Sequence, residues 1–103
     1  MDSSSSARVD PHPAQVTLVV SSGCHFCRDA EDVLTELGRE FRLEVTRVDL
    51  RSPLGSELAQ RHGAAMSPLV LLDGAFVSAG RLPRNKLCRL LAQRADRVGA
   101  VAR

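Results

Sequence analysis

The chain has 103 residues, 44% of them hydrophobic, and its 14 basic and 12 acidic residues give a formal net charge of +2. This length fits one domain that buries its own core, and three cysteines are too few for a disulfide-scaffolded secreted domain. The longest apolar run, residues 69–72, is far shorter than the roughly 20 residues that cross a bilayer, and three phenylalanines without Trp or Tyr disfavour a base-stacking nucleic-acid module.

The N-terminal segment and the high arginine content lead to predictions about the cellular compartment and the source organism. Residues 1–14 contain four consecutive serines and two prolines, so we expect a disordered tail followed by a single domain over residues 15–103. No apolar segment follows a basic start, so we expect no secretory signal and a cytoplasmic protein. Thirteen of the 14 basic residues are arginine, as in the products of GC-rich genomes, and we expect a bacterial source.

Strand and helix patterns alternate through the first half of the domain. The apolar, β-branched segment 15–20 predicts a buried strand, and apolar residues at i, i+3, i+4 and i+7 predict a helix over residues 24–37. Apolar residues within 42–49 predict a second strand, and a Ser-Pro pair then opens a short helix over residues 54–61.

The second half of the domain begins with a predicted hairpin. Residues 68–72 and 75–78 read as two strands joined by the strong turn signal Asp73-Gly74, and a final helix follows over residues 83–97. Helix crossovers make the first strands parallel, whereas the tight turn makes the last pair antiparallel. The order β-α-β-α-β-β-α therefore predicts a three-layer α/β fold with one mixed four-stranded sheet flanked by helices.

The final helix is strongly basic. Its region carries six cations: Arg81, Arg84, Lys86, Arg89, Arg94 and Arg97. We expect them to form a solvated face rather than a docking surface for an acidic partner. The buried face of this helix is predicted at Leu87, Leu90, Leu91 and Ala95. Cys88 lies beside that face, so we expect a half-buried core residue rather than a redox-regulated thiol.

The motif Cys24-His25-Phe26-Cys27 stands between the first predicted strand and the first predicted helix. Two cysteines three residues apart at a helix start lie on one face and can close a small disulfide. Cys24 lies among the free N–H groups of the helix N-terminus, which stabilise the thiolate that attacks disulfides. Cys27, one turn further in, is expected to be more buried and to act as the resolving thiol. The motif therefore indicates a thiol–disulfide oxidoreductase.

Three other interpretations of the two cysteines fit the sequence less well. Inert core cysteines fit poorly with the strand–turn–helix placement. A structural zinc site needs four ligands, and Cys88, His25 and His62 lack a diagnostic spacing. A soft-metal chaperone would end in a strand rather than a basic helix. We therefore expect no resident metal and no cofactor besides the Cys24–Cys27 disulfide.

The segment Met66-Ser67-Pro68 is the second notable feature. Pro68 opens a predicted strand, where proline is tolerated only at a start or an edge. A cis Ser67-Pro68 bond would place the Ser67 backbone beside the cysteines, where it could pair with an extended substrate. Because cis X-Pro bonds are infrequent, these residues alone predict a trans bond.

Together these motifs resemble the glutaredoxin-like branch of the thioredoxin fold over roughly residues 15–95. The resemblance implies a cis Pro68 that faces the active-site disulfide, with Cys24 as nucleophile and Cys27 as resolving cysteine. It also implies a substrate-binding surface formed by His25, Phe26, Met66, Ser67 and Pro68. Protein disulfides are the substrates expected from it, and a low-molecular-weight thiol or a flavoprotein reductase is the expected electron donor. We expect a monomer that binds neither nucleic acid nor membranes.

The sequence departs from the glutaredoxin pattern where glutathione is gripped. His25-Phe26 replaces the usual Pro-Tyr pair, and Ser78-Ala79 replaces the glycine pair, with no matching carboxylate after it. The identity of the reductant therefore stays open: it is glutathione, another thiol or a reductase. The alternative hypothesis is a thioredoxin-fold module that binds a metal or an iron–sulfur cluster through Cys24, or senses redox state, without turnover.

Overall fold

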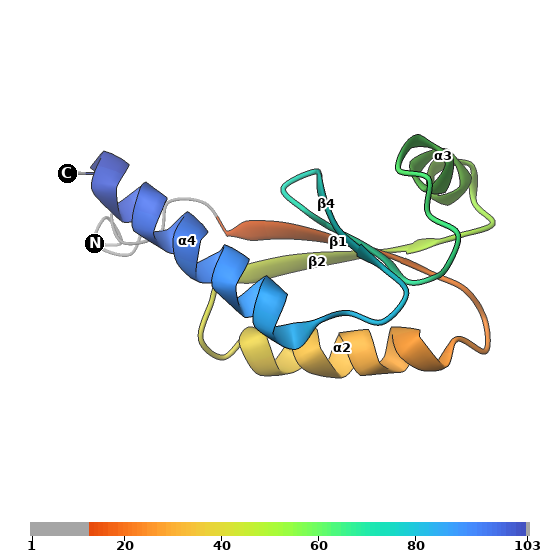
Figure 1. Cartoon of the computed structure of the whole chain (residues 1–103), viewed down its shortest axis with the longest axis horizontal. Coiled ribbons are helices and arrows are strands. Elements are labelled where there is room, and N and C mark those ends of the chain that lie inside the picture. Colours follow the sequence, from red (N-terminus) through yellow and green to blue (C-terminus); the bar gives the residue numbers. More distant parts are fainter. Residues whose placement is uncertain (1–12, 103) are drawn as a thin grey trace.

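The computed structural model describes the backbone of residues 13–102 and the side chains of residues 13–95. The described chain contains four strands and three helices in the predicted order. They are β1 (Ala14–Val20), α2 (His25–Leu37), β2 (Leu43–Asp49), α3 (Pro53–Arg61), β3 (Leu69–Leu72), β4 (Ala75–Ala79) and α4 (Arg84–Ala102) (Figure 1). No helix within the described residues is long and apolar enough to cross a membrane.

Most element boundaries fall within one residue of the prediction. Strand β1 begins at Ala14, so this residue belongs to the sheet rather than to the predicted tail. Residues 1–12 of that tail lie outside the described residues. Helix α4 extends to Ala102, beyond its predicted end near residue 97.

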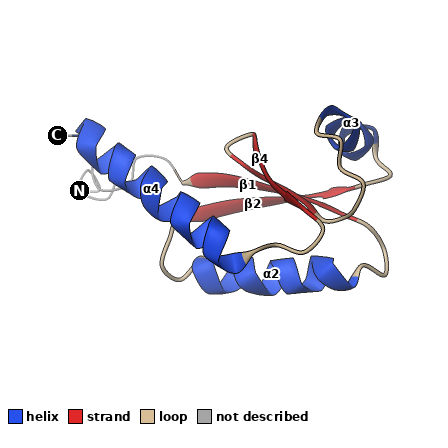
Figure 2. Ribbon diagram, in the orientation of Figure 1, coloured by secondary structure: helices blue, strands red, loops and turns tan. Residues whose placement is uncertain are grey.

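The four strands form one mixed sheet in the order β2-β1-β3-β4. Figure 2 shows the strands of this sheet in red. Strand β1 pairs in parallel with β2, because α2 carries the chain back to the same end of the sheet. It pairs antiparallel with β3, which pairs antiparallel with β4. The hairpin turn between these last strands has Asp73 at φ +50° and Gly74 at φ +85°, as a tight two-residue turn requires. The predicted sheet is confirmed.

The two faces of the sheet carry separate apolar clusters. Val16 and Leu18 of β1 pack on one face with buried side chains of α2 and α4. Val19 points to the opposite face, where Leu58 of α3 covers the smaller cluster. Helices α2 and α4 thus lie on one side of the sheet and α3 on the other (Figure 1). This arrangement is the predicted three-layer α/β architecture.

Helix α3 is fixed at its start by local contacts. Ser52 is the N-cap, and its Oγ accepts a hydrogen bond from the backbone N–H of Gly55 at 3.0 Å. Pro53 occupies the first turn, where its missing N–H costs nothing. Gly55 is buried directly on the β2 backbone, and a Cβ there would overlap the carbonyl of Asp49. The helix therefore approaches the end of β2 as closely as only glycine allows.

Helix α4 corrects two sequence-based expectations. Leu87 and Leu91 are buried as predicted, but Ala95 is exposed. Figure 1 shows that the C-terminal part of α4 extends beyond the strands. Three of its cations also bond to neighbouring elements instead of facing only solvent. Arg84 donates to Glu36 of α2 at 2.7 Å, Lys86 donates to the carbonyl of Val77 at 2.6 Å, and Arg94 donates to Asp73 at 2.6 Å. These bonds tie α4 to α2, to β4 and to the hairpin.

Candidate active site

The Cys24–Cys27 pair lies where the chain passes from β1 into α2. After β1 ends at Val20, Gly23 takes a φ of +69°, which turns the chain into the helix. Cys24 then occupies the N-cap position of α2, and its Sγ accepts a hydrogen bond from the backbone N–H of Cys27 at 3.1 Å. The sulfur therefore fills the role that a serine or aspartate oxygen has at most helix starts. A negative charge on it would lie at the positive end of the helix dipole.

The two cysteines differ in their accessibility. They are joined by a disulfide with a Cα–Cα distance of 5.2 Å. Cys27 is only 5% exposed, whereas Cys24 is partly exposed. The predicted difference in burial is therefore observed, and an incoming sulfur atom has an open approach only to Cys24.

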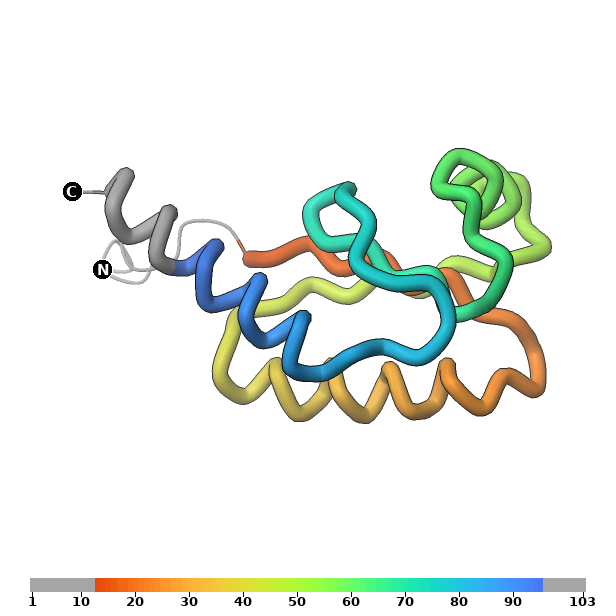
Figure 3. Tube along the Cα trace, viewed as in Figure 1, coloured from red at the N-terminus to blue at the C-terminus, as the bar shows by residue number. Residues whose placement is uncertain are grey.

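The loop before β3 faces this disulfide. The Ser67-Pro68 bond is cis, as the family resemblance implied and as the residues alone did not. The backbone oxygen of Ser67 lies 3.7 Å from Cys24 Sγ, and the Ser67 hydroxyl donates to the same sulfur at 3.6 Å. In the tube of Figure 3 this loop and the β1–α2 turn meet at one end of the sheet.

Ser21 is a member of the site that sequence reasoning missed. Its Oγ lies 2.7 Å from Ser67 Oγ, and both side chains are partly buried. Ser21 follows β1 in a segment that reads only as a turn, and no local pattern connects it with a residue 46 positions later. The contact exists because β1 and β3 are neighbours in the sheet.

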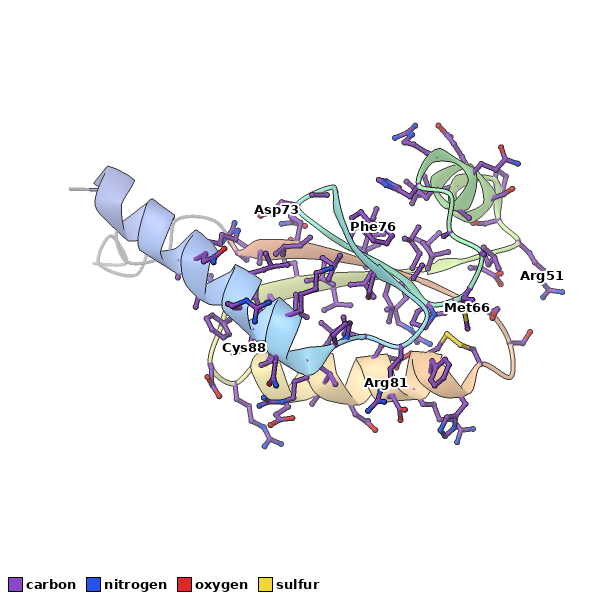
Figure 4. The ribbon with its side chains drawn as sticks, in the orientation of Figure 1. Arg51, Met66, Asp73, Phe76, Arg81 and Cys88 are labelled. Carbon is purple, nitrogen blue, oxygen red and sulfur yellow. A yellow bond between two sulfur atoms is a disulfide. The ribbon has the colours of Figure 1, made fainter. Side chains whose placement is uncertain are left out.

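Met66 of the loop before β3 and Gly80 after β4 lie next to each other. Met66 is 55% exposed and lies near the disulfide in Figure 4. Gly80 has a φ of +99°, and a Cβ there would lie 3.6 Å from Met66 Sδ. The backbone N–H of Gly80 donates to the carbonyl of Pro68 at 2.9 Å. The end of β4 therefore holds the segment Met66-Ser67-Pro68, the cis-proline loop, in place, and the Met66 side chain points outward.

The residues between the two cysteines point away from the core. The His25 side chain is 82% exposed, and its Nε2 lies 3.9 Å from a carboxylate oxygen of Asp29, one turn along α2. Phe26 is partly buried, with its ring tilted against the His25 ring at a centroid distance of 6.1 Å. Both side chains stand at the accessible end of α2.

A cavity of about 330 Å³ opens beside the disulfide, between the start of α2 and strand β2. Its titratable and charged lining consists of His25, Arg28, Glu31 and Arg47 besides the cysteines. Arg47 of β2 and Glu31 of α2 pair at 2.9 Å. The cysteines thus face a polar recess with room for a small thiol or part of a substrate side chain.

The remaining candidate ligands do not join this site. Cys88 is a partly buried free thiol on α4, and Figure 4 shows it away from the yellow disulfide. His62 ends α3, where its ring stacks on Phe76 at 6.3 Å. Among the side chains that the structure describes, no three His, Cys, Asp or Glu residues are grouped so as to hold a metal ion.

Comparison with known proteins identifies the fold. No family model and no curated protein sequence matches the chain. A protein of unknown function from Staphylococcus aureus superimposes with a TM-score of 0.63 at 15% identity, over 82% of this chain and 94% of that one. A thioredoxin variant from Halobacterium salinarum gives 0.60 at 21% identity, over 81% and 75%. Oxidised thioredoxin O2 from Arabidopsis thaliana gives 0.59 at 17% identity, over 85% and 80%. The fold is therefore thioredoxin-like, with a CxxC pair at disulfide distance.

Proposed function

We propose that this protein is a thiol–disulfide oxidoreductase that works by a dithiol mechanism. One observation carries the proposal: the Cys24–Cys27 disulfide lies at the N-terminus of α2 with only Cys24 open to solvent. The thioredoxin-like fold supports it, because disulfide exchange is the chemistry that a CxxC pair in this position suits. Cys24 is the nucleophile and Cys27 the resolving cysteine.

The reaction begins from the reduced pair. The Cys24 thiolate attacks one sulfur of a substrate disulfide, a Cys24–substrate disulfide forms, and the other substrate sulfur leaves as a thiolate that takes up a proton. The Cys27 thiol loses its proton and attacks Cys24 Sγ. The second substrate sulfur then leaves and is protonated in turn. The substrate gains two electrons and two protons, and the protein ends with the Cys24–Cys27 disulfide.

Two features of the site favour the attacking thiolate. The Cys27 N–H already points at Cys24 Sγ, and the helix dipole adds a positive potential at the same atom. Both interactions favour the thiolate form of Cys24 in the reduced protein. Cys27 is only 5% exposed, so a substrate disulfide reaches Cys24 first, and Cys27 acts only after the mixed disulfide forms.

We propose that protein disulfides bind along the cis-proline loop. The Ser67 backbone beside Cys24 offers polar groups to an extended substrate strand, and the exposed Met66 side chain offers an apolar contact next to it. His25 and Phe26 flank the same opening. Binding of a protein disulfide in this way requires no nucleic acid, membrane or resident cofactor, and a monomer is sufficient for it.

Electrons return from a low-molecular-weight thiol or from a flavoprotein reductase. We propose the reducing direction, as expected for a cytoplasmic protein. A Cys24–Cys27 reduction potential of about −230 to −270 mV, found by equilibration with a defined thiol buffer, supports this direction. A value near about −120 mV overturns it and indicates a disulfide donor.

The function itself is tested by turnover. The full chain with dithiothreitol should accelerate the reduction of insulin disulfides, and Cys24→Ser should remove this acceleration. Cys88→Ser is the matched control and should behave as wild type. A purified protein that carries metal or an iron–sulfur cluster and shows no turnover overturns the proposal in favour of a binding module.

A further inference from the structure

Three side chains from two segments, the β1–α2 turn and the cis-proline loop, form a continuous series of polar contacts at the nucleophile. Ser21 Oγ lies 2.7 Å from Ser67 Oγ, and Ser67 Oγ lies 3.6 Å from Cys24 Sγ. Ser21 precedes the helix, Ser67 precedes the cis-proline, and Cys24 caps the helix. All three residues are partly buried.

When Cys24 is reduced, the number of protons on these groups fixes which atom donates and which accepts in each hydrogen bond. A hydroxyl donates one hydrogen bond and accepts up to two. A thiolate only accepts, so Ser67 donates its one proton to Cys24. The Ser67 oxygen is then left as the acceptor, and Ser21 must donate to it. In the disulfide form the sulfur is a weaker acceptor, and the hydroxyl pair is free to reverse its direction.

We propose that Ser21 is a positioning residue that strengthens the hydrogen bond from Ser67 to the Cys24 thiolate. Donation from Ser21 polarises the Ser67 hydroxyl and aims its proton at the sulfur. The pair thereby raises the population of attacking thiolate and relaxes when the disulfide forms. This inference rests on the proposed function, since it assigns to Cys24 the reactive thiolate.

Other charges face the same sulfur and must be separated from this effect. His25, Arg28 and Glu31 of α2 and Arg47 of β2 line the recess beside the cysteines. Residues 21–24 of the turn and the segment Met66-Ser67-Pro68 carry no charged side chain. The serine variants leave these four side chains in place. A change in Cys24 ionisation between the variants therefore measures the effect of the Ser21 and Ser67 hydroxyls.

The test is a double-mutant cycle on Ser21→Ala and Ser67→Ala in the reduced full chain. The rate of Cys24 alkylation by iodoacetamide is followed from pH 4 to pH 10, with the modified cysteine identified by tandem mass spectrometry. At a pH below the midpoint we expect Ser67→Ala to lower the rate about tenfold, since a hydrogen bond to a charged group is lost. Ser21→Ala should lower it about twofold to fourfold, and should add nothing to Ser67→Ala.

Matched variants separate positioning from a structural role. Ser21→Thr keeps the hydroxyl and should restore the wild-type pH profile. Ser22→Ala removes the neighbouring exposed hydroxyl and should leave the profile unchanged. If Ser67→Ala fails to fold, Ser67→Val supplies a second variant without the hydroxyl, because a β-branched residue suits the extended backbone before proline.

The outcomes distinguish this inference from the proposed function. The inference is overturned if Ser21→Ala changes the rate of Cys24 alkylation equally with and without the Ser67 hydroxyl. It is also overturned if Ser21→Ala does not change this rate at all. Both conclusions hold even when insulin reduction is normal. Loss of the expected turnover in the wild type overturns the function, whatever the pH profiles show. A shift that Ser21→Thr fails to restore also overturns the positioning role.

Discussion

Cys24 serves two purposes with one atom. Its Sγ satisfies a free N–H at the start of α2, and the same atom is the accessible sulfur of the disulfide. The two purposes agree chemically, because a group that accepts a hydrogen bond well at a helix N-terminus is also one that carries negative charge well there. The proposed reactivity of Cys24 therefore follows from an ordinary feature of helix ends.

The capping role predicts a difference between two inactive variants. Under reducing conditions, Cys24→Ala should lower the free energy of unfolding by about 1 kcal/mol relative to Cys24→Ser, because alanine leaves the Cys27 N–H without its acceptor. Urea denaturation of both proteins measures the difference. Equal midpoints would show that a side-chain acceptor at position 24 contributes nothing to the helix start.

At the scale of elements, α3 depends on its close approach to β2. Gly55→Ala should destabilise the protein by about 1–3 kcal/mol, because the new Cβ overlaps the carbonyl of Asp49 and forces the helix outward. Helix propensity alone predicts the opposite sign. Ser56→Ala, at the adjacent exposed position, is the control and should be neutral or slightly stabilising in the same thermal unfolding experiment. A stabilising Gly55→Ala would contradict this packing.

The contact between α2 and α4 predicts a dependence on pH. Arg84 donates to both carboxylate oxygens of Glu36, at 3.1 and 2.7 Å, and this bond lowers the pKa of Glu36 below its ordinary 4.5. A carboxyl group with a lowered pKa stabilises the folded state above its unfolded pKa and loses that effect as the pH falls through its folded pKa. Glu36→Gln should therefore lower the Tm slightly at pH 7.

The same difference in Tm between wild type and Glu36→Gln should shrink as the pH falls through the lowered pKa of Glu36 in the folded protein, and should vanish once this carboxyl is protonated in both folded and unfolded chains. Both side chains of the pair are about half exposed, so the effect at pH 7 is small. Thermal unfolding in matched buffers of equal ionic strength measures it. A difference that stays constant across this range would remove the ion pair as its cause.

For the whole molecule, the order of elements was predictable because its signals are local. β-branched runs, the Asp73-Gly74 turn and the Ser-Pro start of α3 each act within a few residues. The apolar positions of α2 recur at helical spacing, and Ala30, Leu34 and Leu37 are indeed buried. Crossover and hairpin rules then leave few ways to pair the strands.

What the sequence did not reveal depends on tertiary neighbours. The Ser21–Ser67 contact joins residues 46 positions apart, and neither serine differs from an ordinary turn residue in the sequence. The partners of the α4 cations, and the exposure of Ala95, depend on where that helix lies over the sheet. The cis Ser67-Pro68 bond followed only from the resemblance, since the residues alone favour trans.

The most direct test of the dithiol mechanism is to remove Cys27 and look for the intermediate. The reduced Cys27→Ser protein is mixed with insulin, quenched with acid and analysed by intact and peptide mass spectrometry. We expect a covalent disulfide adduct at Cys24 that dithiothreitol releases and that wild type does not accumulate, because only Cys27 resolves it. No adduct, or an adduct confined to Cys88, would contradict the assignment of Cys24 as nucleophile and Cys27 as resolving thiol.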